Sequence, residues 1–150
     1  MPAAALDQSH LTHLVGYAAS RAAQRMRRVC LQHFDALGLR VVEFSILVLV
    51  DSNADVNQRQ LGEALDLSAP NLAALLDRMV ERGWIERVRS DQDRRAMHIH
   101  LTPSGRHLVR EAQRIAATME QGALQSLSGA ERALLIELLL KVAHAPAARR

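Results

Sequence analysis

Apolar residues recur with a helical period over most of this chain, so the pattern predicts a mainly α-helical protein. From about Leu6 to Leu37 they fall every three or four residues, which predicts one long helix that Gly38 terminates. The stretch from Arg40 to about Asp51 is apolar on nearly every side, and it predicts a second helix that is buried on most of its surface.

Two shorter helices joined by a tight turn come next in the predicted order. Asn57 is a favourable N-cap, and Gln60 stands where a capping box places Glu or Gln. Asp66 and Leu67 are expected to form the turn, and Ser68 is expected to cap the following helix, which Gly83 should end. In that helix the apolar residues with helical spacing should face a core; they are Leu72, Leu75, Leu76, Met79 and Val80.

Two strands and a charged loop are expected after this helix pair. The predicted strands are Trp84–Val88 and Met97–Leu101, and in the second one apolar residues alternate with His98 and His100, as in a half-buried strand. The loop RSDQDRR between the strands is too charged for a core and suits a narrow DNA groove, where the negative potential attracts arginine. This order of elements predicts a winged helix-turn-helix.

Two further helices complete the predicted architecture. Pro103, preceded by a threonine cap, opens a helix expected to run for about six turns to Leu127. Ser128 and Glu131 form a capping box for a last helix. Its core, Leu134–Ala143, is too apolar for the surface of a monomer, so we expect the first and last helices to meet a second copy of the chain.

The predicted fold class is therefore mainly α with a small two-stranded antiparallel wing. Residues 1–36 and 103–150 are expected to form a helical dimerisation region, and residues 37–102 a winged helix-turn-helix lobe that binds DNA. A two-fold dimer requires a palindromic operator with half-sites about one DNA turn apart.

Composition narrows the function classes. The 150 residues suit one domain, and the formal net charge is only +3, so the clustering of arginine between residues 78 and 95 is the better argument for nucleic acid. One cysteine excludes a disulfide framework, and we expect a cytoplasmic protein because no signal peptide or membrane span is recognisable. The chain has no phosphate-binding loop, GxSxG or HExxH motif, so we predict neither an enzyme nor a cofactor.

The second helix of the pair carries the candidate DNA contacts. Its outer surface begins with Ser68 and Asn71, small and polar residues that suit close approach to base edges. Arg78 and Arg82 lie further along and suit phosphates. A non-specific architectural DNA-binding protein is the alternative to a sequence-specific regulator, and the ratio of specific to non-specific affinity separates the two.

The run LxLSxPNLxxLLDRMVERGWIERVRSDQDRRAxxIHLTPSG resembles the MarR family of bacterial transcription regulators. In that family the wing carries a DRR-type motif followed by a strand that ends in LTxxG; the matching residues are Asp93, Arg94, Arg95, Leu101, Thr102 and Gly105. The resemblance implies that Arg94 and Arg95 read the minor groove, that Asp93 positions Arg95, and that Ser68, Pro70 and Asn71 face the major groove.

This chain departs from the family pattern at the start of that helix. It has Ala69, Ala73 and Ala74 where many members carry Arg or Ser. Since alanine cannot make a bidentate contact to guanine, we expect DNA shape to contribute more than usual to recognition.

The resemblance also implies a ligand that releases the DNA. Members respond to phenolic compounds or aromatic carboxylates, which bind between the dimerisation helices and the DNA-binding lobe. In this chain the matching residues are His13, Tyr17 and Arg21, with Phe44 and Leu47 as an apolar wall. We therefore predict a ligand-responsive repressor that acts as a homodimer. A polar helix surface is the alternative interpretation of the His13–Tyr17–Arg21 row.

Two other side-chain types have competing interpretations. Cys30, near Arg27 and Arg28, suits a redox-sensing repressor if its pKa is lowered, but it also continues an apolar stripe. His98 and His100 point the same way on a strand and are candidates for a metal pair. Because no cysteine or carboxylate cluster stands near them in the sequence, we predict a solvated or phosphate-facing wing surface and no metal.

Overall fold

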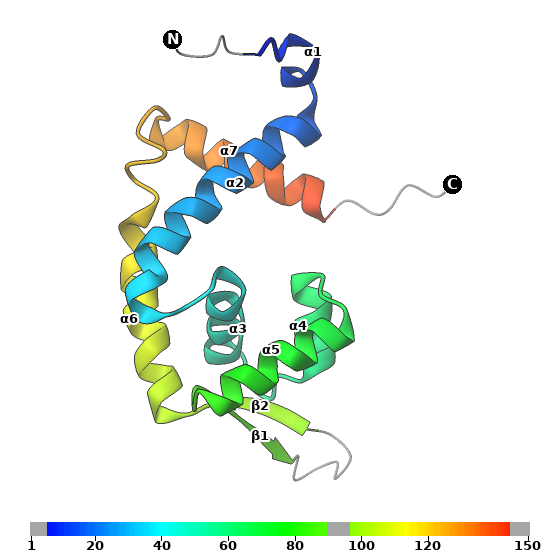
Figure 1. The fold of residues 1–150 in the computed structure, drawn as a ribbon, viewed down its shortest axis with the longest axis vertical. Coiled ribbons are helices and arrows are strands. Elements are labelled where there is room, and N and C mark those ends of the chain that lie inside the picture. The colour runs from blue at the N-terminus through cyan, green and yellow to red at the C-terminus, as the bar shows by residue number, and fades with distance from the viewer. Residues whose placement is uncertain (1–5, 90–96, 145–150) are drawn as a thin grey trace, which may run out of the picture.

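The computed structural model describes residues 6–89 and 97–144, which form helices around one small sheet (Figure 1). In chain order the elements are α1 (Ser9–Thr12), α2 (Val15–Phe34), the short 3-10 helix η1 (Asp35–Leu37), α3 (Val41–Ser52), α4 (Gln58–Leu65), α5 (Ala69–Glu81), β1 (Ile85–Arg89), β2 (Met97–Leu101), α6 (Pro103–Met119) and α7 (Gly129–Ala143). The predicted fold class is confirmed: the protein is mainly α with a two-stranded antiparallel wing.

The prediction of one continuous first helix is wrong at Leu14. This residue has an extended backbone, with φ −87° and ψ 121°, and it separates α1 from α2. Gly16 follows the break and has a low helix propensity. The Tyr17 hydroxyl donates a hydrogen bond to the side chain of Gln8, so the two segments are tied across the break. At the other end α2 stops at Phe34 and continues as the 3-10 helix η1, which Gly38 ends in the left-handed conformation with φ +58°.

The helix pair begins with the predicted capping box. The backbone N–H of Gln60 donates to Asn57 Oδ1 at 3.0 Å, and the backbone N–H of Asn57 donates to Gln60 Oε1 at 2.9 Å. Asp66 makes the turn in the left-handed conformation, with φ +51°. Ser68 occupies the N-cap position of α5, but its side chain makes no capping hydrogen bond, which corrects the prediction made for this residue.

The apolar stripe of α5 is shorter than its sequence pattern predicts. Its first four members are buried, whereas Val80 is 37% exposed. The stripe ends at Met79, whose carbonyl accepts a hydrogen bond from the backbone N–H of Trp84 at 3.0 Å. Trp84 thus lies between the end of α5 and the start of β1, at the edge of the core.

The wing strands pair in antiparallel register from Ile85↔Leu101 to Arg89↔Met97, one residue later in β1 than predicted. Ile99 and Leu101 are buried, while Met97 is 41% exposed, so the alternation in β2 fades toward the wing tip. A third backbone segment joins the sheet, because the N–H of Ile99 donates to the carbonyl of Val56 at 2.7 Å. The segment before α4 therefore lies against the base of the wing.

Helix α6 starts as predicted and ends earlier. The Thr102 side chain caps it by accepting a hydrogen bond from the N–H of Gly105 at 3.0 Å. The helix stops at Met119, and a series of turns replaces the predicted last two turns up to Leu127. Gly122 falls in this segment, and its low helix propensity favours the interruption.

The core lies where the end of α2, α3, the helix pair, the sheet and the first half of α6 meet. Its fully buried side chains include Phe34, Leu47, Leu61, Leu76 and Val109. Glu43 is the one buried charged residue of the described ranges, and its carboxylate accepts a hydrogen bond from the backbone N–H of Arg40 at 2.9 Å.

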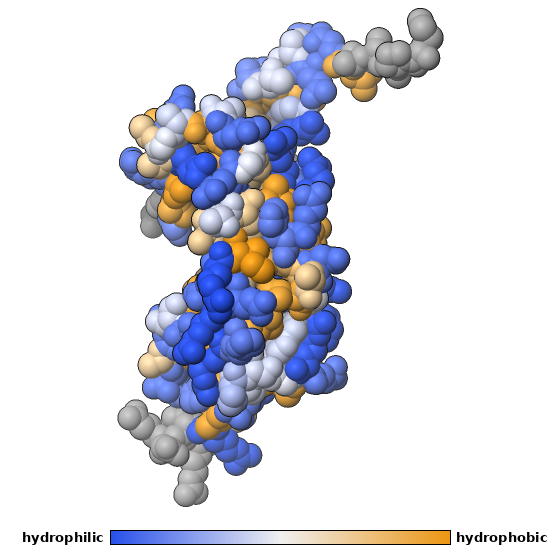
Figure 2. All heavy atoms as spheres, turned by 90° about the vertical axis from the view of Figure 1, so that its left-hand side faces the viewer, coloured by the Kyte–Doolittle hydropathy of each residue, from blue (hydrophilic) through white to orange (hydrophobic). Residues whose placement is uncertain are grey.

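The upper part of the molecule is built differently. Helix α7, which passes behind α2 in the view of Figure 1, contributes no buried residue. Figure 2 shows that the molecule narrows between this upper part and the lower part that holds the sheet and the helix pair. None of the described helices combines the length and the apolarity that a membrane crossing needs.

We expect Gly105→Ala to lower the free energy of unfolding by about 3 kcal/mol, the upper end of the usual cost of overpacking. A Cβ at this position would stand 1.9 Å from the carbonyl oxygen of Trp84, a contact that only a backbone shift relieves. Urea unfolding followed by circular dichroism measures the change.

The matched control is Gly16→Ala, another helical glycine, where an added Cβ meets nothing within 4 Å. It should keep or raise stability by up to about 1 kcal/mol because alanine has the higher helix propensity. Equal stability of Gly105→Ala and the wild type would contradict the close approach of α6 to Trp84.

Candidate nucleic-acid interface

The exposed surface at the start of α5 gathers the residues predicted to face the major groove. Ser68, Pro70 and Asn71 are all exposed there, and Ala74 and Arg78 continue the same side at helical spacing. Because the Ser68 side chain does not cap the helix, the backbone N–H groups of Ala69 and Asn71 remain available for an acceptor from outside, whereas Pro70 has none. An N-terminal helix end of this kind favours a phosphate through its amides and its dipole.

Arg82 has a different environment from Arg78, although it follows one turn later. Its Nη1 donates to the carbonyl of Gly38 at 2.8 Å, and its guanidinium carbon lies 4.2 Å from the centroid of the Trp84 ring. The same Nη1 is 3.9 Å from the carboxylate of Glu43. The guanidinium thus joins the end of α5 to the turn before α3. This geometry indicates a structural role for Arg82, and its predicted phosphate contact stays a prediction.

An ion pair that sequence reasoning missed fixes the wing against α5. Arg87 Nη2 of β1 lies 2.7 Å from Asp77 Oδ1 of α5. Arg89, at the end of β1, is exposed where the wing leaves the body of the protein. The wing-tip residues Asp93, Arg94 and Arg95 lie outside the described residues, and their roles as groove contacts stay predictions.

The two wing histidines have a carboxylate neighbour that the sequence does not place beside them. Asp55 Oδ1 lies 3.4 Å from His98 Nδ1 and 3.9 Å from His100 Nε2. Asp55 precedes α4, and the pairing of Val56 with Ile99 brings it to β2. No cysteine or carboxylate cluster stands near these histidines in the sequence, and the fold supplies the single carboxylate of Asp55 from a distant segment.

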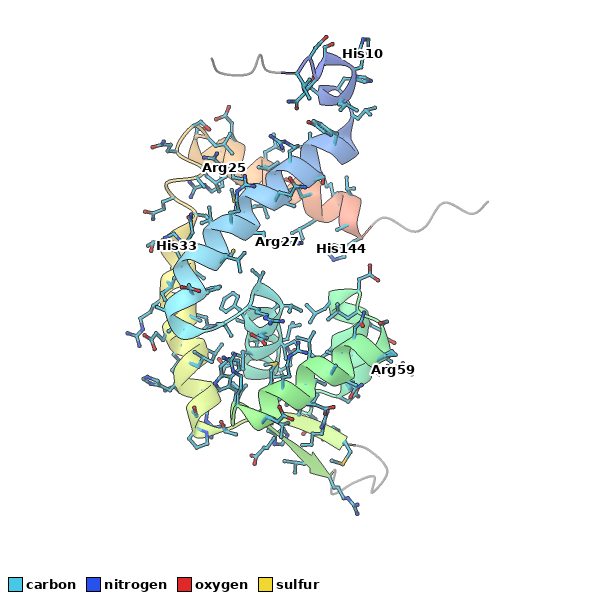
Figure 3. All side chains as sticks on the ribbon, in the orientation of Figure 1. His10, Arg25, Arg27, His33, Arg59 and His144 are labelled. Atoms are coloured by element: carbon cyan, nitrogen blue, oxygen red, sulfur yellow. The ribbon has the colours of Figure 1, made fainter. Side chains whose placement is uncertain are left out.

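The predicted ligand residues fall into two separate groups in one protomer. Leu47 is fully buried, and the Phe44 ring lies 4.9 Å from that of Phe34. Tyr17 lies about 25 Å from Phe34 along the axis of α2, given the rise of an α-helix. His13 and Arg21 lie with Tyr17 toward the upper end, where Figure 3 labels His10.

A groove between α2 and α3, which we call the α2–α3 groove, lies between these two groups. Its volume is about 540 Å³. Residues of α2, α3 and α4 line it, together with the cap of α3, and they include Arg27, Leu31, Arg40, Val41, Val42 and Leu65. Figure 3 shows Arg27 on the part of α2 above α3. No periodic pattern in the sequence indicates this groove, because each element contributes only a few of its residues.

Cys30 lies on the inner side of α2 and is 8% exposed. Burial raises the pKa of its thiol, and the negative charge of Glu120 raises that pKa further. A redox-sensing cysteine needs a lowered pKa and access to the oxidant. The structure therefore favours the alternative interpretation of Cys30 as a small buried apolar residue.

Comparison with known proteins identifies relatives of the chain. The family model described as MarR family matches residues 37–96. The uncharacterized HTH-type transcriptional regulator YpoP of Bacillus subtilis (strain 168) is 31% identical over 100 residues, which are 67% of this chain and 71% of YpoP.

Solved structures extend the likeness to nearly the whole chain. The transcriptional repressor CouR bound to a 23-mer DNA duplex has a TM-score of 0.87 and 32% identity, over 94% of this chain and 100% of CouR. CouR bound to p-coumaroyl-CoA has a TM-score of 0.84 and 29% identity, over 95% and 100% of the two chains. Bordetella bronchiseptica BpsR, whose DNA binding is regulated by 6-hydroxynicotinic acid, has a TM-score of 0.84 and 26% identity, over 91% and 98%. The chain thus belongs to the MarR family, and it is a DNA-binding transcriptional regulator with a winged helix-turn-helix.

Proposed function

We propose that this protein is a homodimeric repressor that binds a palindromic operator and is released by a small phenolic or aromatic carboxylate ligand. The observation that carries the proposal is the likeness, over 94% of the chain, to a repressor solved on DNA. The exposed start of α5 supplies a surface that suits the major groove, and the wing extends beside it.

Helix α7 supports the proposed dimer through its exposed apolar side chains. Seven of its large apolar side chains are between 38% and 65% exposed; they are Leu134, Leu135, Ile136, Leu138, Leu139, Leu140 and Val142. Leu11, Leu14 and Val15 of the α1–α2 region are 43%, 46% and 69% exposed. Contiguous apolar surface of this kind marks a protein–protein interface. A second copy of the chain covers it in a closed two-fold dimer, since an isologous interface pairs the same surface of both subunits.

The α2–α3 groove is the proposed ligand site. Its volume suits a small molecule, and it combines apolar walls with Arg27 and Arg40, which suit a carboxylate or phenolate. The groove lies between a helix of the proposed dimer region and the DNA-binding elements. A ligand that prefers one separation of these parts shifts the dimer toward one spacing of its two α5 helices. Operator binding weakens when that spacing no longer matches the half-sites.

The two alternative functions are weaker. Oxidation at Cys30 is disfavoured by its burial and raised pKa. If the protein were a non-specific architectural DNA-binding protein, selection of binding sites from random DNA duplexes would enrich no sequence. A repressor of the proposed kind predicts one palindromic site with half-sites about one helical turn apart.

We expect Arg78→Ala to weaken binding to the selected operator and to lower by about 1 the slope of log affinity against log salt concentration, as for one lost phosphate contact. Fluorescence anisotropy over a salt series measures both. Arg82→Ala is the matched variant one turn away. Because Arg82 hydrogen bonds to Gly38 and stacks on Trp84, its loss should lower the free energy of unfolding by about 1–3 kcal/mol. The same DNA defect in both variants without a stability difference would contradict these separate roles.

Leu138→Glu should convert the dimer into monomers, because it places a charge within the exposed apolar surface of α7. Sedimentation velocity measures the change. Val80→Glu is the control, since Val80 is also an exposed apolar helical residue but lies on α5. A stable dimer of Leu138→Glu with the wild-type sedimentation coefficient would refute the α7 interface.

Salicylate, p-coumarate or 6-hydroxynicotinate should raise the melting temperature and reduce operator affinity if the ligand class is correct, because a ligand of the native state stabilises it by mass action. Arg27→Gln should reduce both effects while operator binding without ligand stays unchanged. Arg25→Gln is the control, since Arg25 lies on the same helix but does not line the α2–α3 groove (Figure 3). Equal ligand responses in both variants would show that the ligand binds outside the α2–α3 groove. The absence of a response to any of these aromatic anions would contradict the proposed ligand class.

A further inference from the structure

We propose that Asp55, His98 and His100 form a binding site for one divalent transition-metal ion of the Zn²⁺ class, at the junction between the wing and the segment before α4. Among the described residues these three form a group in which one ligand atom from each lies within 4.8 Å of the others. We call this group the Asp55–His98–His100 cluster. It is separate from the DNA-facing start of α5 and from the α2–α3 groove.

The distances in the cluster suit a shared ion. With metal–nitrogen and metal–oxygen bonds near 2.1 Å, two ligand atoms of a tetrahedral site stand about 3.4 Å apart. Asp55 Oδ1 and His98 Nδ1 are already 3.4 Å apart, and Asp55 Oδ1 and His100 Nε2 are 3.9 Å apart. The two imidazole rings are stacked at a centroid distance of 6.5 Å. Small side-chain rotations suffice to bring all three atoms onto one ion.

The type of ligand atom selects the class of metal. Two imidazole nitrogens and one carboxylate oxygen suit Zn²⁺, Ni²⁺, Co²⁺ or Fe²⁺, whereas Mg²⁺ and Ca²⁺ prefer oxygen ligands alone. A hollow of about 430 Å³ opens beside the cluster and is lined by Asp55, His100 and Glu86, among others. Glu86 is the direct cross-strand partner of His100, so their side chains share one face of the sheet. The hollow leaves the remaining coordination positions accessible to water.

The backbone at Asp55 places its side chain next to β2. This residue is in the left-handed conformation with φ +55°, which non-glycine residues adopt infrequently. The next residue, Val56, accepts the hydrogen bond from the N–H of Ile99, which lies between the two histidines in sequence. The peptide geometry thus holds the carboxylate beside a histidine pair whose ring atoms point the same way.

A metal ion in the cluster would join the same two segments that this hydrogen bond joins. Helix α4 begins at Gln58, only a few residues after Asp55, and β2 carries both histidines to the wing. Occupancy therefore tightens the connection between the helix-turn-helix and the wing. This makes wing position, and with it DNA affinity, responsive to the metal.

Titration of the tag-free, EDTA-treated protein with Zn²⁺ by isothermal calorimetry tests the site. We expect one ion per chain in the wild type. When Co²⁺ replaces Zn²⁺, we expect visible absorption bands of the intensity typical of four- or five-coordinate Co²⁺. At a free metal concentration about 100 times the Kd, hydrogen exchange of the Ile99 amide should slow by about 100-fold, because exchange requires the site to open. Mg²⁺ should produce neither effect.

The variants His98→Gln, His100→Gln and Asp55→Asn should each lose the bound ion, the spectrum and the added amide protection. His100 is the safest position to change because its side chain is 43% exposed, and asparagine tolerates the backbone conformation of Asp55. His107→Gln is the matched control: His107 lies 3.9 Å from Glu111 on α6, a histidine–carboxylate pair without a second histidine. It should bind metal as the wild type does.

Two results would overturn the site. One is a wild type that binds no Zn²⁺ or Co²⁺. The other is retention of wild-type metal binding in His100→Gln and Asp55→Asn when both fold with the wild-type circular dichroism spectrum.

Discussion

The arrangement of the DNA-binding elements depends on the contact between the backbone of Trp84 and the start of α6. Gly105, in the first turn of α6, lies so close to the Trp84 carbonyl that a Cβ there would stand 1.9 Å from its oxygen. The Thr102 hydroxyl donates to the carbonyl of Gly83 at 2.6 Å, and Arg82 covers the Trp84 ring. Residues before this junction form α5 and residues after it form β1. The junction therefore sets the positions of α5, the wing and α6 relative to one another.

Helices α2 and α6 extend from this region toward the upper part of the protein, where the kind of packing changes. Below, buried side chains of α3, α5 and the sheet fill a core. Above, α7 has no buried residue, so much of its apolar surface stays exposed when a single chain folds. In the proposed dimer, association would bury this surface and so stabilise the upper part of the protein.

The two proposed regulatory sites lie at opposite ends of α3. The α2–α3 groove includes Val41 and Val42 at the start of this helix, and the Asp55–His98–His100 cluster follows shortly after its end at Ser52. Helix α3 is also packed against α6 and β2. In the two proposals, a ligand in the groove would act on the position of the whole DNA-binding part, and a metal in the cluster would act on the wing within that part. The two inputs are physically distinct and can be measured separately.

Local features of this protein follow from its sequence. The capping box at Asn57, the cap at Thr102 and the left-handed end at Gly38 depend on residues within one helical turn, and all three were predicted. The order of helices and strands also follows from the hydrophobic period, and the family was expected from the resemblance of the wing motif to that of the MarR family. Predictions extended too far where a periodic pattern crosses a break. The first helix stops at Leu14 and α6 stops at Met119, because the apolar phase continues through residues whose backbone leaves the helix.

Only the tertiary structure determines the contacts between residues that lie far apart in the sequence. Arg82 and Arg78 look alike on a helical surface, and only the approach of Gly38 and Trp84 makes one of them structural. Cys30 stands beside arginines in the sequence, yet burial and Glu120 raise the pKa of its thiol. Asp55 meets His98 because a backbone hydrogen bond from Ile99 to Val56 joins two segments that the sequence separates. Period and capping act over a few residues, whereas side-chain environment is a sum over neighbours that only the folded chain brings together.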